Sequence, residues 1–181
     1  MMKAFSDATI VRPSVIYGHE DRFINLIGSN ANLPLGYPIM NKGKTTLRPI
    51  HVSDVAEGIL RVIKSEASVG KLVDFTGPKQ YSFNQMMDLI SKITMRNIKC
   101  FHVDSIALIK LYTIQNSLLS WRVPYFEKDQ ILQFNEAENS SADNLTLADV
   151  GMRELRTFEE DSFEFLRYYR EAREFREPNV L

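Results

Sequence analysis

The stretch from Ala8 to Gly18 constrains the fold more than any other part of the sequence, because it joins a short apolar run to a proline. Residues Ala8–Val11 are apolar or β-branched, which is typical of a parallel strand covered on both faces. Pro13 lacks a backbone N–H and has a fixed φ, so it ends the ladder of hydrogen bonds. Open α/β sheets bind ligands beyond the carboxyl ends of their strands. The sequence therefore predicts an α/β fold in which Ser14–Gly18 forms a ligand-facing loop; an ordinary strand and loop is the alternative.

The segment Arg12–Gly18, with the sequence RPSVIYG, resembles the RPxxxYG segment of extended short-chain dehydrogenase/reductase-like proteins. In that family the loop after a late sheet strand passes the nicotinamide end of a bound dinucleotide, mainly through backbone groups. The resemblance therefore implies a cofactor-binding loop made of Pro13, Ser14, Val15 and Ile16.

Later motifs resemble one branch of this family, the nucleotide-binding accessory subunit of mitochondrial complex I (NADH:ubiquinone oxidoreductase). The similarity covers roughly residues 4–175 and is strongest up to residue 78. The motifs that carry it are His19–Phe23, Pro34–Gly36, Arg48–Ala56, Phe75–Pro78 and Tyr81. This resemblance implies a non-catalytic subunit on the matrix side of the mitochondrial inner membrane, in which the full-length protein binds NAD(P) structurally.

The glycine-rich turn of a dinucleotide-binding domain does not occur in this sequence. The eight glycines are scattered and match neither G-x-G-x-x-G nor G-x-x-G-x-x-G. That turn opens the helix whose N-terminus receives the pyrophosphate. Compared with the fold of that family, Met1 corresponds to the end of the helix that precedes a late strand of the sheet. We therefore expect the C-terminal part of a Rossmann-like fold, with its first half missing, and weak or no NAD(P) binding by this chain alone.

Two regions are expected along the chain. Residues 1–103 would hold late strands and helices of the Rossmann-like domain, and residues 104–181 a mainly helical region that packs on it or on a partner. Within the first region, Ser53–Ser65 predicts a helix capped by its first residue, with an apolar face at helical spacing. Lys71–Phe75 predicts a strand, and Ser82–Gln85 is a capping box that opens a second helix.

The segment Ser105–Trp121 is apolar around most of the helix that it predicts. It is shorter than the ~20 apolar residues that cross a bilayer, and Lys110, Gln115 and Asn116 interrupt it, so it predicts no transmembrane span. Such a helix is buried either in its own domain or against a partner. The resemblance implies that this partner is another complex I subunit, with peripheral membrane association through the complex.

Composition and charge exclude several classes of function. A net charge of −1 and a pI near 6.3 give no basic surface for nucleic acid. The single cysteine, Cys100, excludes an internal disulfide and is expected to be a small buried hydrophobic residue. His19, His51 and His102 are far apart and predict no metal site. Met1–Ala8 has the pattern of neither a secretory signal nor a mitochondrial presequence, so any mitochondrial address would lie on sequence outside this chain.

The sequence predicts no catalytic residue. Classical members of the family use a tyrosine and a lysine four residues later, and no tyrosine of this chain has a lysine at that distance. In the family, however, that pair lies before the point where this chain begins. Two alternatives therefore remain: an NAD(P)-dependent epimerase or reductase of the extended family, with Tyr17 and His19 near the substrate, and an NmrA-like nucleotide sensor.

Overall fold

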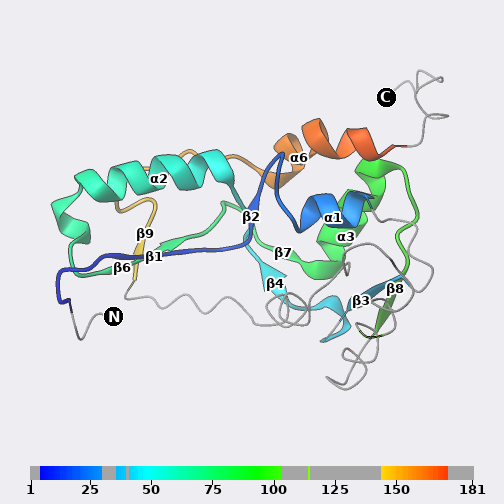
Figure 1. The fold of residues 1–181 in the computed structure, drawn as a ribbon, viewed down its shortest axis with the longest axis horizontal. Helices are drawn as coiled ribbons and strands as arrows, with labels where there is room; N and C mark the ends of the chain where they lie inside the picture. Colours follow the sequence, from blue (N-terminus) through cyan, green and yellow to red (C-terminus); the bar gives the residue numbers. More distant parts are fainter. Residues whose placement is uncertain (1–4, 30–35, 40, 103–113, 115–143, 171–181) are drawn as a thin grey trace. The chain divides into compact units, whose positions relative to one another are not determined.

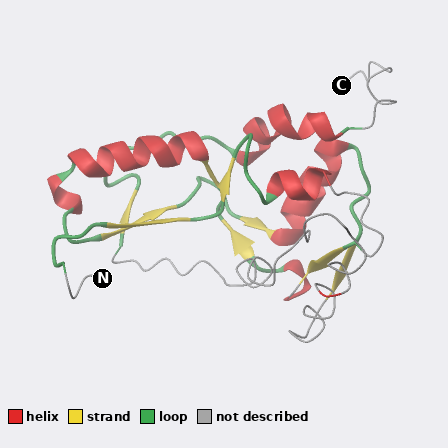
Figure 2. Ribbon diagram, viewed as in Figure 1, coloured by secondary structure: helices red, strands yellow, loops and turns green. Residues whose placement is uncertain are grey.

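The computed structural model describes residues 5–29, 36–39, 41–102, 114 and 144–170, which belong to two compact units. Unit 1 is drawn from Met1–Asp21, Leu47–Tyr81 and Glu138–Phe165, and unit 2 from Arg22–Thr46, Ser82–Ala137 and Leu166–Leu181. Figure 1 labels the elements and Figure 2 colours them by type. The predicted boundary between residues 103 and 104 stays a prediction.

A parallel sheet forms the centre of unit 1. Its strands are β1 (Ile10–Pro13), β6 (Leu72–Phe75) and β9 (Leu145–Thr146), in the order β1-β6-β9. Val11 is in register with Val73, and Asp74 with Thr146. The strand predicted at Lys71–Phe75 is therefore confirmed, and the one predicted at Ala8–Val11 is present but begins two residues later and runs to Pro13. Strand β9 was not expected. A second parallel pair joins β2 (Ile16–Tyr17) to β5 (Ile50–His51).

Helix α2 (Val52–Lys64) runs along β1 and β6 (Figure 1), and the 3-10 turn η2 (Glu66–Ser68) follows it. The core between helix and sheet consists of buried apolar side chains: Ile50, Val55, Val62, Val73, Phe75, Leu147 and Met152. A Cβ at Gly58 would lie 2.7 Å from both Leu147 Cδ2 and Phe75 Cε2, so glycine lets the helix approach closely. The helix predicted at Ser53–Ser65 is confirmed, but its N-cap is His51, whose Nδ1 accepts a hydrogen bond from the Ser53 amide at 3.2 Å.

Helix α6 (Phe158–Leu166) contributes its first eight residues to unit 1. Strands β4 (Thr46–Leu47) and β7 (Tyr81–Ser82) pair with each other, and a boundary between the two units falls within each of them. The remaining elements belong to unit 2: α1 (Ile24–Ser29), β3 (Tyr37–Ile39), η1 (Asn41–Gly43), α3 (Phe83–Thr94), β8 (Cys100–His102) and η3 (Arg167–Tyr169).

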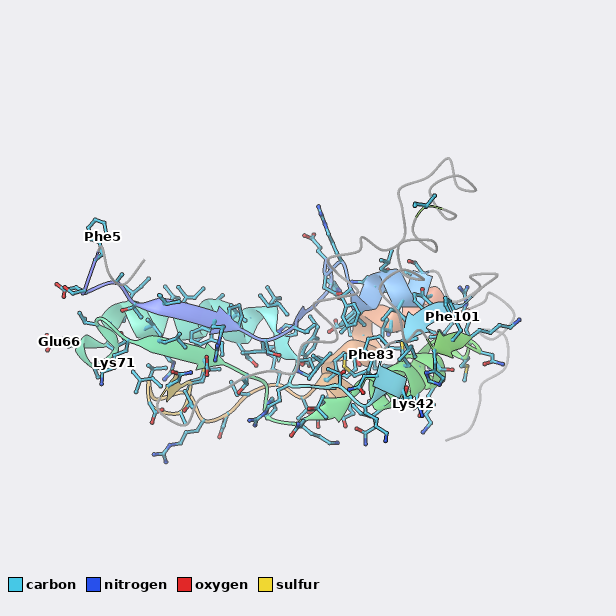
Figure 3. The ribbon with its side chains drawn as sticks, turned by 90° about the horizontal axis from the view of Figure 1, so that it is seen from below. Phe5, Lys42, Glu66, Lys71, Phe83 and Phe101 are labelled. Atoms are coloured by element: carbon cyan, nitrogen blue, oxygen red, sulfur yellow. The ribbon has the colours of Figure 1, made fainter. Side chains whose placement is uncertain are left out.

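Unit 2 confirms the capping box predicted at α3. The Ser82 hydroxyl accepts from the Gln85 amide at 3.2 Å, and the Gln85 side chain accepts from the Ser82 amide at 2.7 Å. Phe83, labelled in Figure 3, opens the helix and packs beside Phe23, with ring centroids 6.1 Å apart. The Tyr37 hydroxyl ties β3 to α1 by donating to the Leu26 and Ile27 carbonyls.

The expectation that Cys100 is buried is wrong, because its side chain is exposed. Strand β8 pairs in parallel with β3 as a two-stranded sheet, and its side chains alternate between more and less exposed positions. Phe101 is half-buried, whereas Cys100 and His102 are exposed on either side of it. Alternation along a strand sends neighbouring side chains to opposite faces, and Cys100 occupies the open face.

Candidate functional site

The loop that follows β1 is held from both sides by backbone hydrogen bonds. Pro13 is the last residue of β1, and the next amide, that of Ser14, donates to the Phe75 carbonyl at 2.8 Å. The Val15 carbonyl accepts from the Ile50 amide at 2.9 Å, and Ile16 then pairs with Ile50 in the β2–β5 ladder. The backbone of this loop is therefore fixed at the carboxyl end of a parallel strand, the edge at which such sheets bind ligands.

The four residues expected to bind a cofactor lie together in this loop. Pro13 and Ile16 are exposed, and Ser14 and Val15 are half-buried, so all four present surface to a ligand. Their role in dinucleotide binding stays a prediction.

Tyr17 lies directly beyond the loop and is fully buried. Its ring meets the rings of His51 and Phe158 edge to face, with centroids 5.2 and 5.1 Å away. Burial raises the pKa of the Tyr17 phenol, and the negative charges of Asp161 and Asp54 raise it further. Tyr17 therefore stays protonated at neutral pH and serves as a core side chain behind the loop.

Tyr81 lies on the other side of Phe158, with ring centroids 5.8 Å apart. Its hydroxyl donates to Glu159, which also forms an ion pair with Lys79. Burial and this hydrogen bond raise the pKa of Tyr81. Partial burial opposes ionisation of Glu159, but the hydrogen bonds from Lys79 and Tyr81 outweigh it and lower the pKa of that carboxyl. Lys79 is therefore paired with the carboxylate of Glu159, and Tyr81 beside it is a weaker acid than an ordinary tyrosine.

His51 and Asp54 anchor the start of α2. Burial lowers the pKa of His51 and favours the neutral imidazole, which leaves Nδ1 free to accept the Ser53 amide. Asp54 is buried and accepts from the Arg156 amide at 2.9 Å, with Arg156 Nε 3.8 Å away. Asp54 thereby links the first turn of α2 to the segment before α6.

A partly buried ion pair joins neighbouring strands of the sheet just before the loop. Arg12 donates from Nε and Nη2 to the two carboxylate oxygens of Asp74 at 2.8 and 3.0 Å, and the Asn144 side chain donates to Asp74 at 2.9 Å. The two residues are directly opposite in the β1–β6 register. Sequence reasoning missed this pair, although a charged residue inside an otherwise apolar strand requires a partner.

Two other sequence expectations concern metals and membranes. Within the described ranges, no three histidine, cysteine, aspartate or glutamate side chains are placed to hold a metal ion. The same part of the chain contains no helix that is long and apolar enough to cross a membrane. The segment Ser105–Trp121, predicted to be buried either in its own domain or against a partner, lies outside the described residues except for Ile114, which is helical and exposed.

Comparison of sequences finds close relatives among mitochondrial proteins. The chain is 32% identical over 172 residues to "NADH dehydrogenase [ubiquinone] 1 alpha subcomplex subunit 9, mitochondrial" of Mus musculus, a match that covers 93% of this chain and 44% of that protein. It is also 32% identical over 149 residues to the protein of the same name from Dictyostelium discoideum, covering 81% of this chain and 41% of that one. The chain thus spans less than half the length of these relatives. No protein-family model matches it.

Solved structures share the fold at low sequence identity. The leucoanthocyanidin reductase–NADPH complex of Vitis vinifera matches with a TM-score of 0.57 and 14% identity, over 87% of this chain and 52% of that one. The dTDP-glucose 4,6-dehydratase DesIV of Streptomyces venezuelae, with NAD and TYD bound, matches with a TM-score of 0.56 and 16% identity, over 95% and 46%. The fold is therefore part of an extended Rossmann-like α/β fold, as the sequence predicted.

Proposed function

We propose, from its homology to part of the alpha subcomplex subunit 9 of mitochondrial NADH dehydrogenase, that this chain belongs to an accessory, non-catalytic subunit of complex I. The observation that carries the proposal is the 32% identity that extends over 93% of the chain. Solved dehydratases and reductases of the same fold share only 14–16% identity with it. The subunit would lie on the matrix side of the inner membrane and contact other complex I subunits, including through Ser105–Trp121.

A bound NAD(P) would act as a structural group in the full-length protein. The loop Pro13–Ile16 would pass the nicotinamide end through its backbone, whose direction is set by the hydrogen bonds of Ser14 and Val15. A ligand that binds only the folded state stabilises it by mass action, without any reaction. The phosphate-binding turn is not in this sequence, so the 181-residue chain alone would bind NAD(P) weakly or not at all.

The tyrosines near the loop are not suited to act as the general acid or base that the enzyme alternative would need from this part of the protein. A tyrosine that acts as the general acid or base works best when its pKa is lowered toward the pH of the reaction. Burial instead raises the pKa of both Tyr17 and Tyr81. Neither side chain is prepared for proton transfer, and both are explained by packing around Phe158.

Assembly with complex I tests the proposal. The gene product that carries this chain is tagged at its carboxyl end, and mitochondria are solubilised in mild detergent and separated by native electrophoresis. We expect the tag in the band that oxidises NADH, and the tagged protein should catalyse no dinucleotide-dependent epimerisation or reduction of sugar nucleotides. A tag that migrates only at low mass, together with turnover of such a substrate, would support the enzyme alternative.

Two variants at one position test the loop. Ser14→Ala keeps the amide that donates to Phe75, whereas Ser14→Pro removes it. Because the backbone carries the proposed role, Ser14→Ala should leave NAD(P) retention by the full-length protein unchanged and Ser14→Pro should abolish it, as measured by dinucleotide released on denaturation. Equal retention in both variants would refute the role of the loop.

A further inference from the structure

A network of charged and polar side chains links β1 and β6 to the residue that precedes β9. The carboxylate of Asp74 accepts hydrogen bonds from Arg12 Nε, from Arg12 Nη2 and from the Asn144 side chain, at 2.8, 3.0 and 2.9 Å. We call these three residues the Arg12 network. A bidentate pair of arginine and carboxylate has one preferred geometry, so it fixes the spacing of the two strands that carry it.

The Arg12 network lies on the face of the sheet opposite α2. Val73 and Phe75 belong to the core beneath that helix, and Val11 packs against them. Side chains alternate along a strand, so Arg12 and Asp74 point to the other face. Replacing a buried ion pair by apolar side chains is often neutral or even stabilising. The network therefore needs an explanation other than the stability of the core.

The network lies directly before the hydrogen bond that holds the candidate loop to the sheet. The Ser14 amide donates to the Phe75 carbonyl at 2.8 Å; Arg12 comes two residues before Ser14, and Asp74 one residue before Phe75. The register of β1 with β6 ends at Phe75 and its partner Pro13. A hydrogen bond at the end of a ladder opens more easily than one inside it. An ion pair one step earlier keeps this bond closed.

We propose that Arg12 and Asp74 are positioning residues for the nicotinamide end of a bound dinucleotide. The pair holds the end of β1 against β6, and this keeps the Ser14 amide bonded and the backbone of Pro13–Ile16 directed toward the ligand. Neither side chain needs to contact the ligand. The inference rests on the proposed function, which assigns this loop to NAD(P). A binding site loses affinity when the contacts that support it become loose.

A positioning role and a purely structural role differ in their effect on the two ends of the dinucleotide. The loop is assigned to the nicotinamide end alone. Its displacement should therefore weaken binding of NADH or NADPH but not of ADP, which carries the adenosine and the diphosphate without the nicotinamide ribose. A general loss of folding would weaken binding of both by the same factor.

Titration of the full-length protein tests the inference. The gene product that carries this chain is purified as wild type, as Arg12→Met and as the double variant R12M/D74N. NADH is compared with ADP, and NADPH with ADP 2′-phosphate, by calorimetry at a temperature at which every variant is folded. We expect both variants to raise the Kd of the reduced dinucleotide about tenfold and to leave that of the matching ADP within about twofold of wild type.

The double variant and one core variant provide the matched comparisons. R12M/D74N leaves no unpaired carboxylate, so it should regain stability relative to R12M and still bind the dinucleotide weakly. Val62→Ala removes volume from the core on the α2 face, in the last turn of a helix whose first residue directly follows β5. It should lower the melting temperature and leave both dissociation constants unchanged.

Three results would overturn the inference. These are an unchanged Kd of the dinucleotide in both network variants, an equal weakening of dinucleotide and ADP, or a double variant that regains wild-type affinity together with its stability. If Ser14→Pro abolishes retention while the network variants bind normally, only this inference fails. A wild-type protein that binds no dinucleotide would overturn it together with the structural role of NAD(P), whereas assembly with complex I is tested independently.

Discussion

Removing either partner of the Arg12–Asp74 ion pair should destabilise unit 1, but by unequal amounts. The Arg12 side chain is 47% exposed and Asp74 is 3% exposed. Arg12→Met takes the guanidinium away from a carboxylate that water does not reach, and breaking a buried pair in this way costs about 3–5 kcal/mol. In Asp74→Asn the half-exposed guanidinium is hydrated instead, so the loss of its charged hydrogen bonds should cost about 1–2 kcal/mol.

Urea denaturation of the purified protein measures both free energies of unfolding. The double variant R12M/D74N should be more stable than R12M alone, because its buried side chain at position 74 is neutral and still bonds to Asn144. A coupling of this sign is expected for residues in direct contact. The reasoning is refuted if D74N costs more than R12M, or if the two costs simply add.

Three further predictions concern unit 1 and α3. A Cβ at Gly77 would lie 1.8 Å from the Pro49 carbonyl oxygen, so Gly77→Ala should lower the free energy of unfolding by about 3 kcal/mol in urea titrations; an unchanged midpoint would contradict this close approach. Ser82→Ala removes the side-chain cap of α3 and should cost about 1 kcal/mol, with faster hydrogen exchange confined to its first turn. Burial lowers the pKa of His51 in the folded state below its usual 6.5, so the unfolded chain binds a proton more tightly than the folded chain. The neutral imidazole therefore stabilises the folded state above pH 6.5, and this stabilisation is lost as the pH falls through the folded pKa. His51→Asn keeps a side-chain acceptor that does not titrate, and thermal unfolding should then depend less on pH in this range.

Local sequence patterns predicted the elements of the fold whose causes are local. The apolar run before Pro13 gave a strand, helical spacing after His51 gave α2, and the capping box at Ser82 gave α3. Strand β9 was missed because it has only two residues. Its pairing depends on the position of β6 and not on a pattern in the sequence of β9 itself.

The site was only partly predictable, because its packing joins residues far apart in the chain. The loop Pro13–Ile16 followed from a motif, but Tyr17 meets Phe158 across 141 positions of sequence. The His51 cap was missed because a serine two residues later is the more common capping residue, and tertiary contacts moved the helix start. Cys100 was misplaced because alternation alone does not reveal which face of a two-stranded sheet stays open.

The number of copies of this protein per complex I tests the central claim most directly. Complex I is purified through an unrelated subunit, and quantitative mass spectrometry compares this protein with the other subunits at successive steps. An accessory subunit should be present at one constant ratio to the others from the first step to the last. A ratio that falls toward zero as purification proceeds would contradict the proposal and make the homology evidence of shared ancestry alone.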